Sequence, residues 1–345
     1  MARIAIVGVG AIGGVVASLV QSAGRHELVL CVRKPLVELV VETPGGVIRI
    51  DATVLTDPAE ARPVDWVMVA TKAYDVAGVA KWLEGLCAKG APVAVLQNGV
   101  EHRERFAPYV AAEKIVPVIV DCPVERKSPE RIVQRGGMSL KVPEGGLGTQ
   151  FVELFAGAAA DVATVPDWVT VAWRKLCHNS AGVLSVLLLR PNEVMHDEAI
   201  GEVALQIVRE CVVVGRAEGA VLSDAVPDEV LAAYRKAAPD GVNSMLADRL
   251  AGRQTEIDAR NGVIVRAGER HGIATPNNAM NPMEAERLRF MPRTHSAAIP
   301  PTKAKGTLAT TSSASLADAN VRYRSTKISA IASGTIKSSR RVARS

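Results

Sequence analysis

A glycine-rich segment directly after the first apolar run constrains the fold of this chain more than any other feature. Residues 3–7, "RIAIV", are followed by "GVGAIGG", which contains the pattern GxGxxG and opens a helical segment. In this strand–turn–helix context, the first glycine permits a tight turn, the second lets the backbone approach a pyrophosphate, and the third lets helix and strand pack closely. The amides at the start of such a helix attract phosphate charge. The segment therefore predicts a dinucleotide site, with a glycine-rich turn that binds no ligand as the alternative. The contacting residues would be Gly8, Val9, Gly10, Ala11, Ile12 and Gly13.

Apolar runs alternate with helical patterns through the first 166 residues. The runs "HELVLCV", "DWVMVAT", "PVAVLQNG" and "KIVPVIV" are continuously apolar, as expected of strands covered on both faces. Residues 11–24 and 75–86 lie between such runs and have the pattern of helices. The order of strand, helix and strand predicts an α/β Rossmann-type, NADP-binding domain with a parallel sheet over residues 1–166.

After residue 166 the strand patterns give way to long helical ones. Val, Ile and Leu recur at three- and four-residue spacing, which predicts an all-helical substrate and catalytic domain over residues 167–280. The expected helices cover residues 167–189, 196–219, 226–237 and 242–272.

Residues 281–345 differ in composition from both predicted domains. From residue 279 onward the chain has 12 Lys and Arg against 3 Asp and Glu, a net charge of +9, whereas the preceding residues have 29 against 33, a net charge of −4. This basic tail is rich in Ser, Thr and Ala and has no periodic apolar stripe, so we expect it to be poorly ordered. A tether to a membrane or RNA and a read-through extension are the alternatives.

Composition and spacing argue against several classes of protein. The five cysteines are scattered without CxxC spacing and the six histidines lie far apart, which argues against a disulfide framework and a zinc site. No apolar stretch approaches the ~18 residues of a membrane span, and we expect no signal peptide before the first strand. The first 278 residues show no basic, aromatic-interleaved face for a nucleic acid. We expect a cytoplasmic protein with a small-molecule substrate, without metal, nucleic acid or membrane; the sequence allows a homodimer.

The end of the second predicted strand favours NADPH over NADH. NAD-preferring Rossmann domains place an Asp or Glu about 20 residues after the glycine pattern. This sequence has "LVLCVRKP" there, with no acidic residue after Glu27, and Arg33 and Lys34 stand where a 2′-phosphate would lie. A guanidinium donates to a phosphate in a fork. Arg33 is therefore the predicted 2′-phosphate contact, with a solvated pair of charges on a loop as the alternative.

Two further segments directly follow predicted strands. Ligands in open parallel sheets bind beyond the carboxyl ends of the strands, where "TKAYD" (71–75) and "QNGV" (97–100) should lie. Lys72 and Asn98 are therefore predicted to contact the cofactor or the substrate. The alternatives are a solvated lysine at a strand end and an Asn–Gly turn.

The segment "WRKLCHNSAGVLSV" (173–186) places polar side chains in an apolar helical pattern. Lys175 and Asn179 lie one turn apart on one face of the predicted helix. A lysine in a partly dry cleft has its ammonium form disfavoured, so it releases a proton more readily to a developing alkoxide. The alternative is a lysine whose stem lies along the surface. His178 is interpreted as a structural histidine.

A second polar segment, "NSMLADRLAGRQTEID" (243–258), falls in the last predicted helix. Asp248, Gly252 and Glu256 would step along one helical face, with Gly252 leaving room for a ligand to approach. Ser244 lies near the start, where a hydroxyl and free amides accept a carboxylate. Glu256 would orient Lys175 or a substrate hydroxyl. The alternative for each is an ordinary residue on a helix surface.

Taken together, these motifs resemble those of the ketopantoate reductase family, the NADPH-dependent 2-dehydropantoate 2-reductases. The resemblance covers residues 3–278 and rests on the order and spacing of "GVGAIGG", "TKAYD", "QNGV", "WRKLCHN" and "SMLADRLAGRQTEID", followed by "NGVIVRAGERHGIATPN". It implies a Rossmann domain followed by a helical domain, with the active site in the cleft between them. It also implies reduction of ketopantoate to pantoate, a step of pantothenate biosynthesis, with hydride from NADPH.

The resemblance implies a role for each matching residue. Lys175 would be the proton donor, and Glu256 would be its partner near the substrate hydroxyl and the cofactor. Asn98 would touch both cofactor and substrate. The substrate-binding positions would be Asn98, Lys175, Asn179, Asn192 and Ser244, with Ser244 holding the carboxylate.

One position departs from the family pattern. The family commonly has a second asparagine one turn beyond the first, where this sequence has Val183. Helical spacing would place Val183 on the face of Lys175 and Asn179, and an isopropyl group cannot hydrogen-bond a substrate. A reductase of another 2-keto acid is therefore the first alternative function. A non-catalytic NADP sensor and a polyanion-binding protein acting through the tail are the others.

Overall fold

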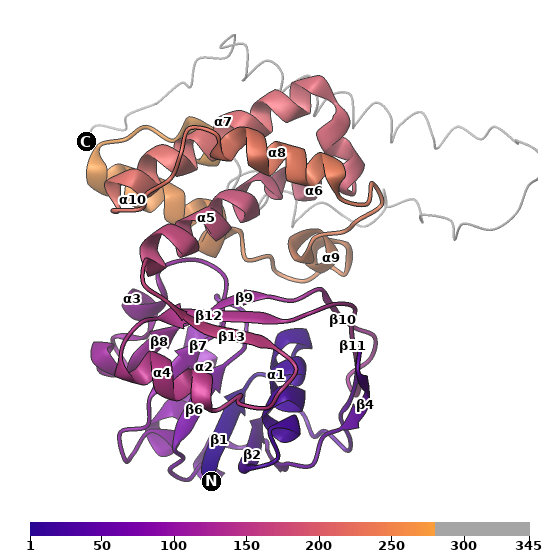
Figure 1. Cartoon of the computed structure of the whole chain (residues 1–345), viewed down its shortest axis with the longest axis vertical. Helices are drawn as coiled ribbons and strands as arrows, with labels where there is room; N and C mark the ends of the chain where they lie inside the picture. Colours follow the sequence, from indigo (N-terminus) through magenta and orange to yellow (C-terminus); the bar gives the residue numbers. More distant parts are fainter. Residues whose placement is uncertain (280–345) are drawn as a thin grey trace, which may run out of the picture. The chain divides into compact units, whose positions relative to one another are not determined.

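The computed structural model describes residues 1–279, so the predicted basic tail from residue 281 onward lies outside the described residues. The chain divides into two compact units between Leu176 and Cys177, within helix α5 (Trp168–Ala181). The first unit contains all the described strands, and the described part of the second is helical (Figure 1). The predicted fold class, a Rossmann-type α/β unit followed by a helical one, is therefore confirmed.

A six-stranded parallel sheet forms the centre of the first unit (Figure 1). Its order is β5-β2-β1-β6-β7-β8, and each neighbouring pair runs parallel. The chain therefore proceeds outward in opposite directions from β1 and from β6, and ligands of open α/β sheets bind beyond the carboxyl ends of the strands at such a switch point. The bounds are β1 Ala2–Val7, β2 His26–Cys31, β5 Thr53–Leu55, β6 Trp66–Val69, β7 Val93–Val95 and β8 Ile115–Pro117.

Alternate residues of β1 are buried in two separate apolar clusters, which explains why its sequence is continuously apolar. Ile4 belongs to the cluster that includes residues of α1 (Ala11–Ser22), whereas Ala5 belongs to the cluster that includes residues of α2 (Val76–Leu86). Because successive side chains of a strand point to opposite faces, α1 and α2 cover opposite faces of the sheet. The other helices of this unit are η1 Pro58–Glu60, α3 His102–Phe106, η2 Ala112–Lys114 and α4 Gly146–Glu153.

Two smaller sheets, which the sequence patterns did not predict, complete the first unit. Their orders are β10-β11-β3-β4 and β13-β12-β9. A Cβ at Gly14 of α1 would overlap the Ile132 side chain of β11, so α1 packs directly against the first of these sheets. The predicted run "KIVPVIV" is shared between β8 and β9. The bounds are β3 Val40–Thr43, β4 Gly46–Arg49, β9 Ile119–Asp121, β10 Val124–Arg126, β11 Arg131–Gln134, β12 Ser139–Pro143 and β13 Asp161–Val165.

The longest helix of the second unit, α7 (Glu198–Ala217), packs against α8 (Val226–Lys236) (Figure 1). The Asp197 side chain caps α7 by accepting a hydrogen bond from the Ile200 amide at 3.1 Å. The other elements of its described part are α6 Val183–Leu188, η3 Asn192–His196, α9 Ser244–Leu250, the π-helical turn η4 Asp258–Gly262 and α10 Val263–His271.

Two predicted helices are each interrupted at a glycine. The helix predicted over 167–189 breaks at Gly182, whose carbonyl accepts a hydrogen bond from Asn243 Nδ2 at 3.0 Å. The helix predicted over 242–272 ends with α9, because Gly252 has φ of +67°. The Arg253 amide bonds back to the Asp248 carbonyl at 2.8 Å, the glycine-terminated C-cap of a helix. The predicted single helical face of Asp248, Gly252 and Glu256 is therefore wrong.

All five cysteines lie in the described part of the chain and are free thiols. The nearest pair, Cys177 and Cys211, is buried with the sulfur atoms 3.4 Å apart. Over residues 1–279, no helix is both long enough and apolar enough to cross a membrane.

Candidate active site

The glycine turn lies between β1 and α1, as the sequence predicts. Gly8 has φ of +93°, a conformation that favours glycine, and its amide donates to the Cys31 carbonyl at 3.0 Å. A side chain at this position would press against the Thr71 backbone and methyl group. The turn is therefore held between β2 and the segment that follows β6.

The other two glycines of the pattern have different surroundings. A Cβ at Gly13 would overlap the Gly8 carbonyl oxygen, so only glycine lets α1 pack this closely against the turn. A Cβ at Gly10, by contrast, would meet no atom within 4 Å, and Gly10 caps α1 without a side-chain hydrogen bond. The space beside Gly10 and the uncapped first turn of α1 fit the pyrophosphate of a dinucleotide. The first turn of α1 also has no acidic residue to repel it.

The segments after β6 and β7 are tied together by a side chain that sequence analysis did not single out. Gln97 Nε2 donates to Thr71 Oγ1 at 3.0 Å and to the Lys72 carbonyl at 3.3 Å. Because β6 and β7 are parallel neighbours, Lys72 and Asn98 lie at the same sheet edge as Gly8. The structure therefore brings these predicted cofactor contacts together.

A buried histidine supports the second of these segments. His102, at the start of α3, is 3% exposed and its Nε2 donates to the Gln97 carbonyl at 2.8 Å. Burial lowers its pKa to about 4, helped by the charges of Arg105 and Arg103. The ring is therefore neutral at pH 7 and fixes the backbone next to Asn98 without adding a charge to the site.

Arg33 lies two residues beyond β2, with 90% of its side chain exposed. Its nearest ion-pair partner is Asp75, at a loose 3.9 Å. Glu27 is the second residue of β2 and pairs with Arg3 at 2.9 Å, near the amino end of the strand. The carboxyl end of β2 thus presents cationic side chains, Arg33 and the exposed Lys34, where an NAD-preferring domain would have an acid.

Lys175, in the part of α5 that belongs to the first unit, pairs with a carboxylate that sequence analysis did not anticipate. Its Nζ lies 3.1 Å from Oδ1 of Asp121, the last residue of β9. The Lys175 side chain is 28% exposed and that of Asp121 72% exposed. Lys175 is therefore partly buried and ion-paired. Both groups of this pair have access to solvent.

Asn179 follows Lys175 by one turn of α5, and both are half-buried. Val183, by contrast, does not lie on the helical face of Lys175 and Asn179 as predicted. Val183 begins α6 beyond the break at Gly182, and its exposed fraction is 0%. It is a core residue, so its replacement of an asparagine does not by itself alter a substrate-facing surface.

Glu256, Asp248 and Arg260 form the buried charged cluster of the second unit, each 4% exposed. Glu256 lies in the connection between α9 and η4, and Arg260 lies within η4. Burial lowers the pKa of Arg260, whereas the neighbouring charges of Glu256, Tyr234 and Asp248 raise it. Arg260 Nη2 donates to the Ser244 hydroxyl oxygen at 2.9 Å, which links the cluster to the predicted carboxylate-binding serine.

Asn192 has a local structural task in addition to its predicted one. Its backbone amide donates a hydrogen bond to the Gly241 carbonyl at 3.0 Å, and its side-chain Nδ2 donates to the Ala238 carbonyl at 3.4 Å. Its Oδ1 is buried and has no hydrogen-bond partner among the described residues. Asn192 therefore holds the 238–241 turn and retains one acceptor.

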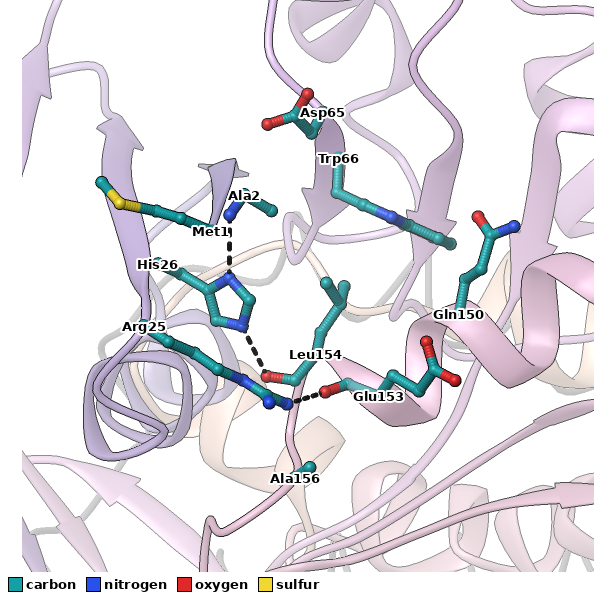
Figure 2. Close-up of a pocket in the computed structure, with 10 residues that line it drawn as sticks. All are labelled: Met1, Ala2, Arg25, His26, Asp65, Trp66, Gln150, Glu153, Leu154 and Ala156. Atoms are coloured by element: carbon teal, nitrogen blue, oxygen red, sulfur yellow. Dashed lines mark hydrogen bonds between the residues drawn. The ribbon is translucent and has the colours of Figure 1, made fainter.

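The first unit also has a hollow of about 420 Å³, away from its glycine turn (Figure 2). Its lining includes the first residues of β1, β2 and β6, so it opens at the amino ends of the strands, opposite the glycine turn. His26 fills part of it, accepting from the Ala2 amide and donating to the Leu154 carbonyl at 3.1 Å. The neutral ring joins two strands to the end of α4, which makes this hollow a packing seam and not the dinucleotide site.

Comparison with known proteins identifies the relatives of this chain. Residues 4–146 match the model of the family Ketopantoate reductase PanE/ApbA, and residues 167–281 match the model of its C-terminal part. The chain belongs to the ketopantoate reductase family. It is an oxidoreductase of this family, whose members use a nicotinamide cofactor, and the open space beside Gly10 fits that cofactor's pyrophosphate.

The family assignment extends over nearly all of the described chain. A 2-dehydropantoate 2-reductase of Caulobacter vibrioides is 50% identical over 280 residues, covering 81% of this chain and 97% of that protein. A 2-dehydropantoate 2-reductase of Mycobacterium tuberculosis is 42% identical over 275 residues, covering 79% and 93%. The solved 2-dehydropantoate 2-reductase of Geobacter metallireducens aligns with a TM-score of 0.77 at 26% identity, covering 83% and 99%.

Proposed function

We propose that this chain catalyses the NADPH-dependent reduction of 2-dehydropantoate to pantoate, with Lys175 as the proton donor. Two relatives, 50% and 42% identical, are 2-dehydropantoate 2-reductases. The structural observation that carries the mechanism is the pairing of Lys175 Nζ with Asp121 at 3.1 Å. An ammonium group next to a carboxylate is suited to protonate a nascent alkoxide.

The cofactor would lie along the glycine turn. Residues 8–13 would hold its pyrophosphate, Lys72 and Asn98 would contact it at the ends of β6 and β7, and Glu256 would lie near it. Arg33 would pair with the 2′-phosphate, which distinguishes NADPH from NADH, because its guanidinium is exposed and only loosely engaged by Asp75. When bound, NADPH supplies the hydride that adds to the ketone carbon.

Lys175 Nζ would give a proton to the carbonyl oxygen of the substrate as the ketone is reduced. The neutral amine then regains a proton from water, to which the partly exposed side chain has access. General acid help of this kind contributes ~10²–10⁴ in rate. Asp121 would position the ammonium group, and Glu256 would orient Lys175 or the substrate hydroxyl.

Substrate recognition would rest on polar side chains. Ser244 would bind the carboxylate, and Asn98, Asn179 and Asn192 would bind the remaining polar atoms. The buried Oδ1 of Asn192 has no partner among the described residues, so it can accept from a substrate hydroxyl. Substrate selectivity is then set by these groups, since Val183 is fully buried.

A panel of 2-keto acids, followed by loss of NADPH absorbance at saturating cofactor, tests this proposal. We expect 2-dehydropantoate to give the highest kcat/KM. A higher value with another branched 2-keto acid would replace the substrate assignment. NADPH binding without oxidation by any keto acid would indicate the non-catalytic sensor instead. A chain truncated after Asn278 should keep its activity, and loss of function on truncation would favour the polyanion-binding alternative.

A further inference from the structure

Arg260 is an arginine buried beneath an exposed serine. Arg260 is 4% exposed, and its Nη2 donates a hydrogen bond to Ser244 Oγ at 2.9 Å. Ser244 itself is exposed. Arg260 lies in η4, a single π-helical turn, and such turns occur frequently at functional sites. Its Nε is buried and has no hydrogen-bond partner within residues 1–279. A buried guanidinium with an unused donor costs free energy, so its retention calls for a compensating role.

The hydrogen bond from Arg260 determines what the Ser244 hydroxyl can do. A hydroxyl has one donor hydrogen and two acceptor lone pairs. Because Ser244 Oγ accepts from a cationic donor, its own hydrogen points to a different partner and is polarised by the guanidinium charge. The pair therefore presents a hydrogen-bond donor next to a guanidinium group, which suits a carboxylate oxygen of a ligand.

The charge of Arg260 is balanced by its neighbours. Glu256 and Asp248 are its anionic neighbours, and Asp248 is also paired with Arg253 at 2.9 Å. One of the two carboxylates is therefore already partnered by another arginine. The two carboxylates and the two guanidinium groups carry no net charge together, so Arg260 acts on Ser244 through their direct hydrogen bond at 2.9 Å.

We propose that Arg260 is a positioning and specificity residue, which fixes the Ser244 hydroxyl as a donor to the substrate carboxylate and so selects 2-keto acids over neutral ketones. This inference rests on the proposed function. Arg260 itself does not touch the reacting atoms. Its removal should therefore weaken recognition of the carboxylate and leave cofactor binding unchanged.

The test compares reduction of 2-dehydropantoate with reduction of its primary amide, using the full chain. Arg260→Met keeps much of the side-chain length and removes the charge. We expect it to raise KM for the acid by about 10- to 100-fold, the loss of a hydrogen-bond system to a charged group, while KM for the amide and for NADPH changes little. Arg260→Lys should restore part of the acid preference, since the positive charge returns. Ser244→Ala should reduce the acid preference, and adding it to Arg260→Met should cause little further loss.

Arg235→Met serves as the structural control. Arg235 donates to the Met195 carbonyl at 2.8 Å, so this variant should lower stability while preserving the ratio of kcat/KM for acid and amide. Equal losses for acid and amide in Arg260→Met, or no change in either, overturn the inference. If Arg260→Met does not fold, an unaltered acid preference in both Arg260→Lys and Ser244→Ala overturns it. A wild-type enzyme that reduces neither compound overturns the proposed function and this inference with it.

Discussion

In the first unit the candidate site residues are brought together by the geometry of the backbone. In the second unit they are held together by contacts between buried charged side chains. Gly8, the end of β6 and the end of β7 meet because parallel strands end at one edge of a sheet. Ser244, Glu256 and Arg260 come from separate segments and are held by a guanidinium hydrogen bond and neighbouring charges. Substitution of a glycine should therefore disturb the structure of the site in the first unit most. Loss of a buried charge should disturb the site in the second unit most.

The largest effect on stability should come from Gly13→Ala. Its Cβ would overlap the Gly8 carbonyl, so strand and helix must separate, at a cost of about 3 kcal/mol in the free energy of unfolding. Gly10→Ala is the matched control, because open space lies at that position. It should change the free energy of unfolding by under ~0.5 kcal/mol yet raise KM for NADPH, since the pyrophosphate approaches there. Urea unfolding and cofactor titration measure the two effects, and equal destabilisation by both variants would contradict this geometry.

A smaller effect, confined to one cofactor, is expected at the end of β2. Arg33→Ala should raise KM for NADPH by about 30-fold, equivalent to about 2 kcal/mol, and leave KM for NADH nearly unchanged. The control is Arg49→Ala, which removes a surface arginine paired with Glu38. Similar losses for NADPH and NADH in Arg33→Ala would remove Arg33 from 2′-phosphate recognition.

The last of these predictions concerns how the stability of the first unit depends on pH. The folded-state pKa of His102 is lowered from 6.5 to about 4, so between these values the unfolded chain takes up a proton that the folded chain excludes. Stability should therefore fall as pH decreases through this window, by up to about 1.4 kcal/mol per pH unit, and this contribution should be constant above and below it.

His102→Gln isolates that contribution, because glutamine can still donate to the Gln97 carbonyl and does not titrate. The difference in free energy of unfolding between wild type and variant should shift in favour of the variant from pH 6.5 to pH 4. Parallel pH profiles from urea denaturation would show that His102 is not the titrating group.

Local sequence predicted the parts of the fold that depend on local pattern. The strand–turn–helix at Gly8 and the cationic end of β2 each occupy a few consecutive residues. The break at Gly182 was missed because it depends on Asn243, 61 residues away, whose side chain binds the Gly182 carbonyl. The end of α9 did have a local signal, since a glycine followed by a polar residue is a usual helix terminator.

The partners within the candidate site were less predictable than its principal residues. Lys175 stands out in an apolar helical pattern, but Asp121 lies 54 residues earlier at the end of a short strand. Gln97 and Arg260 are likewise defined by contacts with distant segments. No local pattern marks Arg260, because Glu256, Asp258 and Asn261 make its surroundings in the sequence polar as well.

The most direct test of the proposed mechanism is the turnover of Lys175→Ala, measured beside NADPH binding by fluorescence. The variant should lose ~10²–10⁴ in kcat while its Kd for NADPH stays within about twofold of wild type. Lys81→Ala, an exposed lysine of α2, should retain full activity. Wild-type turnover in Lys175→Ala would contradict the assignment of Lys175 as the proton donor.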